Sequence, residues 1–196
     1  GWGNDDEMSI KNLSHKVTML VALTSAARAS EIQAMTTTNL ADTGHKITFN
    51  LDTLSKTSKQ GDPLPTLEIF EYLPDQNLDP VKCVRAYLVR TTDWRHDGDG
   101  DKLLRSTRPP HQGLATSTIS NWLKTTIHAA GLDADFTGHS TRAAATSKAN
   151  FKGLSVKEIL ARANWSSANT FFRHYNKVVH SNDINAFSES VLDTTS

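Results

Sequence analysis

Apolar residues recur at helical spacing soon after the polar start of the chain. The first stripe, at positions i, i+3, i+4 and i+7, consists of Val17, Leu20, Val21 and Thr24. It predicts a helix beginning at Ser14. Residues 1–13 are polar and carry no such stripe, so we expect them to form a flexible N-terminal segment.

Two short apolar runs then predict strands at residues 47–50 and 67–70, whereas residues 36–44 are typical of a loop. A turn-rich, basic stretch over residues 55–61 lies between the two runs. This order predicts a small antiparallel sheet with an exposed hairpin tip.

Caps and stripes mark further helices in the rest of the chain. Asp79 followed by Pro80 is a typical helix start, and Ser155 with Glu158 forms a capping box. Gly131 ends a helix that begins at about residue 117. Helices are also expected near residues 140–150, 167–179 and 182–192.

The predicted fold class is therefore mainly α with a small antiparallel β-sheet (α+β). We expect one main domain over residues 14–180, followed by a C-terminal helix or tail over residues 181–196. The tail carries an apolar stripe on an otherwise polar helix, made of Ile184, Phe187, Val191 and Leu192.

The amino-acid composition limits which kinds of partner, nucleic acid or membrane, the chain is expected to bind. Lys plus Arg and Asp plus Glu both number 21, so the formal net charge is zero. Free-standing nucleic-acid-binding domains are usually basic, so a DNA-binding face here requires local clustering or a second domain. Cys83 is the single cysteine, which fits a reducing compartment. No run of about 18 apolar residues occurs, so no membrane partner is expected.

The sequence contains no complete motif for binding calcium, zinc or a nucleotide phosphate. Residues 97–101 resemble the opening of a calcium loop, but Lys102 and Arg108 stand where that loop needs Gly and Glu. The eight histidines form no zinc-binding pattern, and no phosphate-cradling P-loop is present. The chain starts without Met or a signal-peptide pattern, and we interpret it as an excised domain.

Several residues suit chemistry on a phosphodiester, although each also has a structural explanation. Arg28 with Glu31 at i+3 is either a surface ion pair or a phosphate-binding arginine with its orienting carboxylate. His139 and Arg142 share one face at a predicted helix start, where backbone N–H groups favour an anion. Tyr175 is either a half-buried aromatic or a nucleophile.

Trp165 also has both a structural explanation and one in phosphodiester chemistry. It stands at the end of a predicted helix, where its indole N–H is either buried in the core or available to a phosphate oxygen.

The order of these residues resembles the catalytic set of the tyrosine recombinase (phage integrase) family. Residues 23–32 resemble the family's Thr-Gly-x-Arg-x-x-Glu box, with Ala in place of the usual Gly, and residues 138–146 resemble its His-x-x-Arg box. Residues 159–175 are most similar to recombinases of eukaryotic mobile elements of the DIRS, Ngaro and crypton kind. In those proteins Trp often replaces a second His.

The resemblance implies a metal-independent and cofactor-free reaction in DNA recombination. It makes Tyr175 the nucleophile, which would form a 3′-phosphotyrosyl bond and release a 5′-hydroxyl. Arg28 and Arg142 would stabilise the phosphate oxygens, and Glu31 would support the Arg28 loop. The remaining catalytic roles would fall to Lys56 as proton donor, His139 in proton transfer or phosphate orientation, and Trp165 at the phosphate.

Two departures affect this assignment. Tyr175 follows Trp165 by ten positions, whereas the family pattern has nine, and the ninth position here is His174. We interpret this as a one-residue insertion. Both Lys56 and Lys59 lie on the hairpin, and the Ser-Lys-Thr context favours Lys56.

The resemblance also implies double-stranded DNA as partner, an N-terminal DNA-binding domain not contained in this chain, and a dimer or tetramer on DNA. The C-terminal stripe would dock onto a neighbouring subunit or pack on its own domain. Basic residues that could contact DNA are Lys59, Arg105, Arg108, Lys148, Arg162 and Arg173. The expected location is nuclear for a eukaryotic mobile element and cytoplasmic otherwise.

Alternative functions remain at this point. One is a catalytically inactive DNA-binding module that kept the fold, and another is a type IB topoisomerase that nicks and reseals DNA. A helical interaction domain with a coincidental match is the third.

Overall fold

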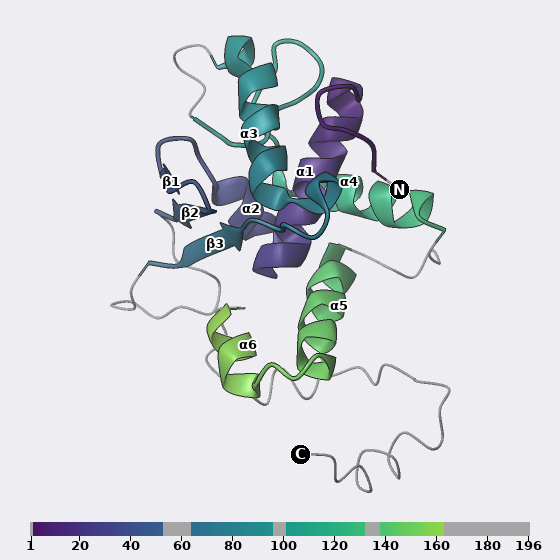
Figure 1. Cartoon of the computed structure of the whole chain (residues 1–196). Helices are drawn as coiled ribbons and strands as arrows, with labels where there is room; N and C mark the ends of the chain where they lie inside the picture. Colours follow the sequence, from purple (N-terminus) through teal and green to yellow (C-terminus); the bar gives the residue numbers. More distant parts are fainter. Residues whose placement is uncertain (1, 53–63, 96–100, 132–137, 163–196) are drawn as a thin grey trace, which may run out of the picture.

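A central helix, α1 (Ile10–Ser25), organises the structure, which is a computed structural model describing residues 2–52, 64–95, 101–131 and 138–162. Helices α3 (Pro80–Arg90), α4 (Thr116–Ala129) and α5 (Gly138–Phe151) all pack against α1 (Figure 1). The short helix α2 (Ala29–Ala34) packs on α4, and α6 (Val156–Arg162) packs on α5. The 3-10 turns η1 (Gln76–Leu78) and η2 (Thr92–Trp94) flank α3.

A three-stranded antiparallel sheet in the order β1-β2-β3 covers one side of this helical core (Figure 1). Its strands are β1 (Leu40–Asp42), β2 (Lys46–Asn50) and β3 (Thr66–Phe70). Ile47 pairs with Ile69 and Phe49 with Leu67, and all four side chains are buried against the helices. The two strands predicted at residues 47–50 and 67–70 are therefore confirmed, each with one more residue at its start.

Strand β1 lies inside the segment predicted to be a loop, and that prediction is wrong. The strand has three residues, and two of them are exposed. A short edge strand with little buried surface carries no strong apolar alternation, so only its pairing with β2 reveals it.

Helix α1 is buried on nearly all sides, including several polar positions. The hydroxyls of Ser14 and Thr18 donate to the carbonyls of Ile10 and Ser14, at 2.7 Å in each case. These local bonds satisfy polar groups that would otherwise be desolvated without a partner. The helix can therefore contact elements on several sides without leaving polar atoms unpaired.

Part of the segment before α1 is packed, whereas we expected a flexible segment over residues 1–13. Ser9 caps α1, so the helix begins at Ile10, four residues before the predicted start at Ser14. Asp5 is 2% exposed and lies 2.7 Å from the ammonium of Lys16, which is fully buried. Arg90 donates to the carbonyls of Asp5 and Met8.

A hydrophobicity pattern does not reveal the buried ion pair of Asp5 and Lys16, because charged residues are normally expected on the surface. The burial of this pair therefore explains why the sequence pattern missed the packed N-terminal segment.

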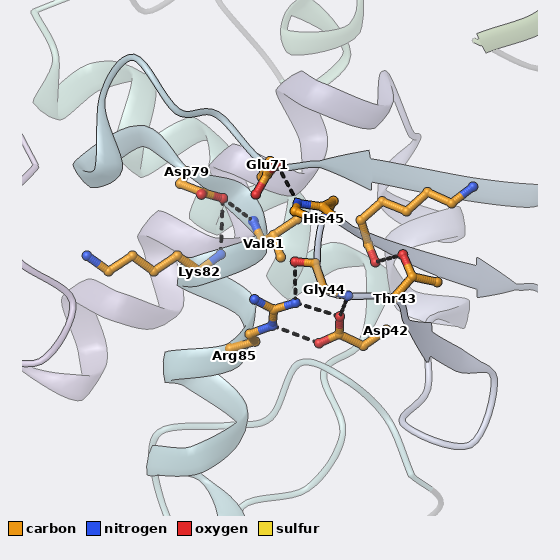
Figure 2. A network of polar contacts seen from close by, with 10 residues as sticks. Asp42, Thr43, Gly44, His45, Glu71, Asp79, Val81, Lys82 and Arg85 are labelled. Carbon is orange, nitrogen blue, oxygen red and sulfur yellow. Dashed lines mark hydrogen bonds and ion pairs between the residues drawn. The ribbon is translucent and has the colours of Figure 1, made fainter.

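Helix α3 is tied to the sheet by a network of charged side chains (Figure 2). Arg85 donates to both carboxylate oxygens of Asp42, at 2.7 and 2.6 Å, and to the carbonyl of Gly44. These bonds lower the pKa of Asp42 to about 2. Asp79 accepts from the N–H groups of Val81 and Lys82, which confirms the predicted cap of α3.

The later helices agree closely with their predicted positions. Helix α4 begins one residue early, and Gly131 follows it with φ of +80°. Ser155 and Glu158 exchange the two hydrogen bonds of the capping box before α6. The helices predicted at residues 167–179 and 182–192 lie outside the described residues.

Substitution of Lys16 by Met tests the buried ion pair. We expect the free energy of unfolding to fall by about 3–5 kcal/mol, because Asp5 would keep a buried charge without its partner. Chemical denaturation measures the change. The control is Lys11→Met on the exposed side of the same helix, which should leave stability nearly unchanged. Equal effects of the two substitutions would contradict the pairing.

Candidate functional site

The turn between α1 and α2 carries the first candidate residue, Arg28. Helix α1 ends at Ser25, whose hydroxyl donates to the carbonyl of Val21 at 2.6 Å and accepts from the N–H of Ala27 at 3.2 Å. Ala26 adopts a left-handed conformation with φ of +52° and ψ of +27°. The chain then becomes extended at Arg28, the residue that precedes α2. This tight reversal places Arg28 at the start of a new helix.

Glu31 fixes the Arg28 turn from the first turn of α2. One carboxylate oxygen accepts from the backbone N–H of Arg28 at 2.6 Å, and the other accepts from its guanidinium Nη1 at 3.1 Å. Glu31 is 5% exposed, so both bonds lie in a water-poor environment. The predicted support of the Arg28 loop by Glu31 is thus present in the structure.

The same carboxylate also reaches Arg142 on α5. Nη1 of Arg142 lies 3.3 Å from the Glu31 oxygen that accepts from the Arg28 backbone. That Nη1 also donates to the carbonyl of Ala26 at 2.8 Å. Residues more than 100 positions apart in the sequence therefore meet at one carboxylate.

The charges of this cluster favour an anion. Two guanidiniums face a single carboxylate, and arginine stays protonated at any ordinary pH. The three side chains together carry one formal positive charge, in a region where water screens it poorly. A phosphate group has the charge and the acceptor oxygens to complete such a cluster.

The two arginines differ in accessibility. The side chain of Arg28 is 20% exposed, whereas Arg142 is 2% exposed and ranks among the largest fully buried side chains. In this conformation Arg28 is the member of the pair that solvent reaches. The sequence pattern placed Arg142 at a helix start that favours an anion, and in this conformation its guanidinium is enclosed.

The other predicted catalytic residues are placed only in part. His139 lies in the first turn of α5, three positions before Arg142, but its side chain is outside the described part of the chain. Four further candidates also fall outside the described residues, namely Lys56, Lys59, Trp165 and Tyr175. The structure therefore brings together Arg28, Glu31 and Arg142.

The candidate DNA-contacting residues separate into surface and interior positions. Arg108 and Lys148 are exposed, as a phosphate contact requires. Arg105 is 2% exposed, and its Nη1 donates to the carbonyl of His111 at 3.1 Å. Arg105 is therefore interior in this structure, next to the buried pair Leu103 and Leu104, whereas we expected it on a DNA-contacting surface.

Two further candidates remain untested. The side chain of Arg162, the last residue of α6, and the whole of Arg173 lie outside the described residues.

Sequence reasoning missed the contacts that Arg142 makes. A backbone carbonyl leaves no side-chain signal, and nothing in the local pattern joins residue 31 to residue 142. One signal was available. The family box has Gly two positions before its Arg, where this chain has Ala26, and Gly at such a position indicates a left-handed backbone.

Groups of three or more His, Cys, Asp or Glu side chains that could hold a metal are absent from the part of the chain that the structure describes. Among those same residues, no helix is both long enough and apolar enough to cross a membrane. Cys83 is buried, and this burial raises the pKa of its thiol, so it is a poor nucleophile.

Substitution of Glu31 by Gln tests the cluster. The amide keeps the shape but removes the charge between two guanidiniums, so we expect the free energy of unfolding to fall by about 3 kcal/mol. Chemical denaturation measures this loss. The control is Glu68→Gln on the exposed face of the sheet, where loss of the Lys46 ion pair should change stability by about 0–1 kcal/mol. A Glu31→Gln protein as stable as the control would refute the proposed role of this carboxylate.

Comparison with solved structures gives three informative similarities. XerA recombinase superimposes with a TM-score of 0.67 at 15% identity, over 95% of this chain and 61% of that one. XerH recombinase bound to difH substrate in a pre-cleavage complex gives 0.64 at 12% identity, over 95% and 49%. A lambda integrase dimer bound to a COC′ core site gives 0.55 at 16% identity, over 86% and 45%.

These similarities show a common fold, and this chain spans about half to three fifths of the length of those proteins. Comparison with curated proteins found no match. The model of the phage integrase family matches residues 4–182, which is most of the chain and includes every candidate catalytic residue. The chain therefore belongs to the phage integrase family, the tyrosine recombinases.

Proposed function

We propose that this chain is the catalytic part of a tyrosine recombinase that cleaves and rejoins DNA strands in site-specific recombination or integration. The observation that carries the proposal is the Arg28–Glu31–Arg142 cluster, in which the two predicted phosphate-binding arginines meet at one carboxylate. Family membership supports the same conclusion, because the matched residues include the whole predicted catalytic set.

The proposed reaction begins with the phenol of Tyr175 attacking the scissile phosphorus. The bond from phosphorus to the 5′-oxygen breaks, and its electron pair leaves with that oxygen, which takes a proton from Lys56. The phenolic proton passes to His139 or to water. The product is a 3′-phosphotyrosyl bond and a free 5′-hydroxyl, and attack by a 5′-hydroxyl of a second strand reverses the step and rejoins the DNA.

Phosphoryl transfer depends mainly on positioning and on stabilisation of charge. Arg28 and Arg142 would neutralise the non-bridging oxygens, a task that metal ions perform in many nucleases. A fixed guanidinium does so without reorganising during the reaction. This is why we propose a metal-independent and cofactor-free mechanism, with Trp165 completing the phosphate site.

Double-stranded DNA is the proposed partner, and the whole protein would supply an additional N-terminal DNA-binding domain. XerH was solved bound to difH substrate, lambda integrase bound to a COC′ core site, and the Tn1549 transposon integrase in complex with transposon right end DNA. The exposed residues Arg108 and Lys148 are proposed phosphate contacts. The Trp at residue 165 favours a eukaryotic mobile element as source, with nuclear action.

We also propose that protomers assemble on DNA as a dimer or tetramer through the C-terminal segment, residues 181–196. A cavity of about 770 Å³ with a mainly apolar lining lies between α1, the end of α4 and the start of α5. Its apolar lining includes Met8, Met19, Leu23, Ile127 and Ala144. A cavity of this size and polarity suits the apolar stripe Ile184, Phe187, Val191 and Leu192 from a neighbouring copy.

A covalent-adduct assay tests the catalytic proposal. The full-length protein selects its binding site from random duplexes, and a nicked version of that site is then incubated with the protein in EDTA. We expect a covalent protein–DNA adduct, because the nick lets the 5′-product diffuse away. Substitution Tyr175→Phe should abolish the adduct, and Arg28→Ala or Arg142→Ala should slow its formation by about 10²–10³-fold.

The matched control is Tyr72→Phe, since Tyr72 is an exposed tyrosine outside the cluster. Tight binding with no adduct would favour an inactive DNA-binding module. Adduct formation with resealing but no ligation between two duplexes would favour a type IB topoisomerase. Dependence on added metal would contradict the metal-independent mechanism.

Removal of residues 181–196 tests the assembly proposal. We expect the truncated protein to retain the adduct on a single half-site but to lose the dimer or tetramer on a complete site. Analytical ultracentrifugation with DNA measures this change. Substitution Ala144→Trp, which fills the proposed cavity, should reproduce the loss, and full assembly of both variants would refute the docking.

A further inference from the structure

The turn that follows α1 is unusual because it is left-handed at a residue with a side chain. Within the described residues, only Ala26 and His111 combine a side chain with positive φ, at +52° and +59°. A Cβ atom disfavours this conformation, so a non-glycine residue keeps it only where its surroundings enforce it. Such backbone often occurs at functional sites.

Contacts on both sides hold Ala26 in this conformation. The hydroxyl of Ser25 accepts from the N–H of Ala27, and Glu31 accepts from the N–H of Arg28. The side chain of Ala26 is buried against Ile159 of α6. The turn is therefore fixed from α1, α2 and α6 at once.

The left-handed backbone brings the carbonyl of Ala26 to Arg142. That carbonyl accepts from Nη1 at 2.8 Å, closer than the 3.3 Å between Nη1 and Glu31. A guanidinium is planar, so two acceptors on one terminal nitrogen restrict the rotation of the whole group. A bidentate phosphate contact requires a defined orientation of that plane.

We propose that Ala26 is a positioning residue for Arg142, acting through its backbone carbonyl. The left-handed turn orients the Arg142 guanidinium toward the scissile phosphate. This inference rests on the proposed function in one respect, namely that Arg142 binds the phosphate. The contact itself is independent of catalysis.

Replacement of the amide between residues 26 and 27 by an ester tests the contact. Incorporation of lactic acid at position 27 turns the Ala26 carbonyl into a weaker acceptor and leaves every side chain in place. It also removes the N–H that donates to Ser25, so Ser25→Ala is the matched control. Ala26→Gly is the second control, because Gly adopts positive φ without strain.

The first measurement is the rotation of the Arg142 guanidinium about its Cζ–Nε bond, observed by NMR in the 196-residue chain. In the unmodified protein, Arg142 should rotate at least about tenfold more slowly than the exposed Arg108, since its Nη1 has two acceptors. Equal rates would overturn the proposal even if the ester protein failed to fold. The ester should speed the rotation of Arg142 by about tenfold, and the two controls should stay within about threefold.

The second measurement is adduct formation on the nicked duplex by the full-length protein. The ester should slow cleavage by about tenfold while DNA affinity changes less than about twofold, because the contact orients a group used in the transition state. Faster rotation with unchanged cleavage would refute the positioning role. Faster rotation in a protein whose unmodified form yields no adduct would confirm the contact and refute the recombinase function instead.

Discussion

The Glu31 carboxylate is the interaction on which the candidate site depends. Two guanidiniums from distant parts of the chain, Arg28 and Arg142, lie against it in a water-poor environment. Without the carboxylate, their mutual repulsion would be screened poorly, and α5 would lose one of its polar contacts with the α1–α2 turn. With it, the two guanidiniums are held together at the turn with a net positive charge of the three side chains.

Helix α1, at the centre of the fold, supports this arrangement. The helix ends at the turn that carries Ala26 and Arg28, and it packs against α3, α4 and α5. The turn is therefore anchored by a helix that is itself held from several sides. The hydroxyl groups within α1 bond to their own helix, so burial leaves little polar surface to destabilise it.

Elements with a continuous apolar pattern were predictable from the sequence. The helices near residues 80, 117 and 156 and the two longer strands follow from caps, stripes and short apolar runs, because these signals are local. The edge strand β1 was missed, since it buries little surface. The packed segment before α1 was missed because the buried pair of Asp5 and Lys16 looks like solvated surface in a linear pattern.

The sequence by itself determined the α+β class and the pairing of Arg28 with Glu31, since these depend on neighbours within a few positions. The resemblance of its motifs to a family named the candidate catalytic residues. Only the tertiary structure decided that Arg142 shares that carboxylate, that its second acceptor is the carbonyl of Ala26, and that Arg105 is interior. The physical reason is the same in each case. Contacts between residues far apart in the chain, and contacts made by backbone atoms, depend on how the elements pack and leave no periodic trace in the order of side chains.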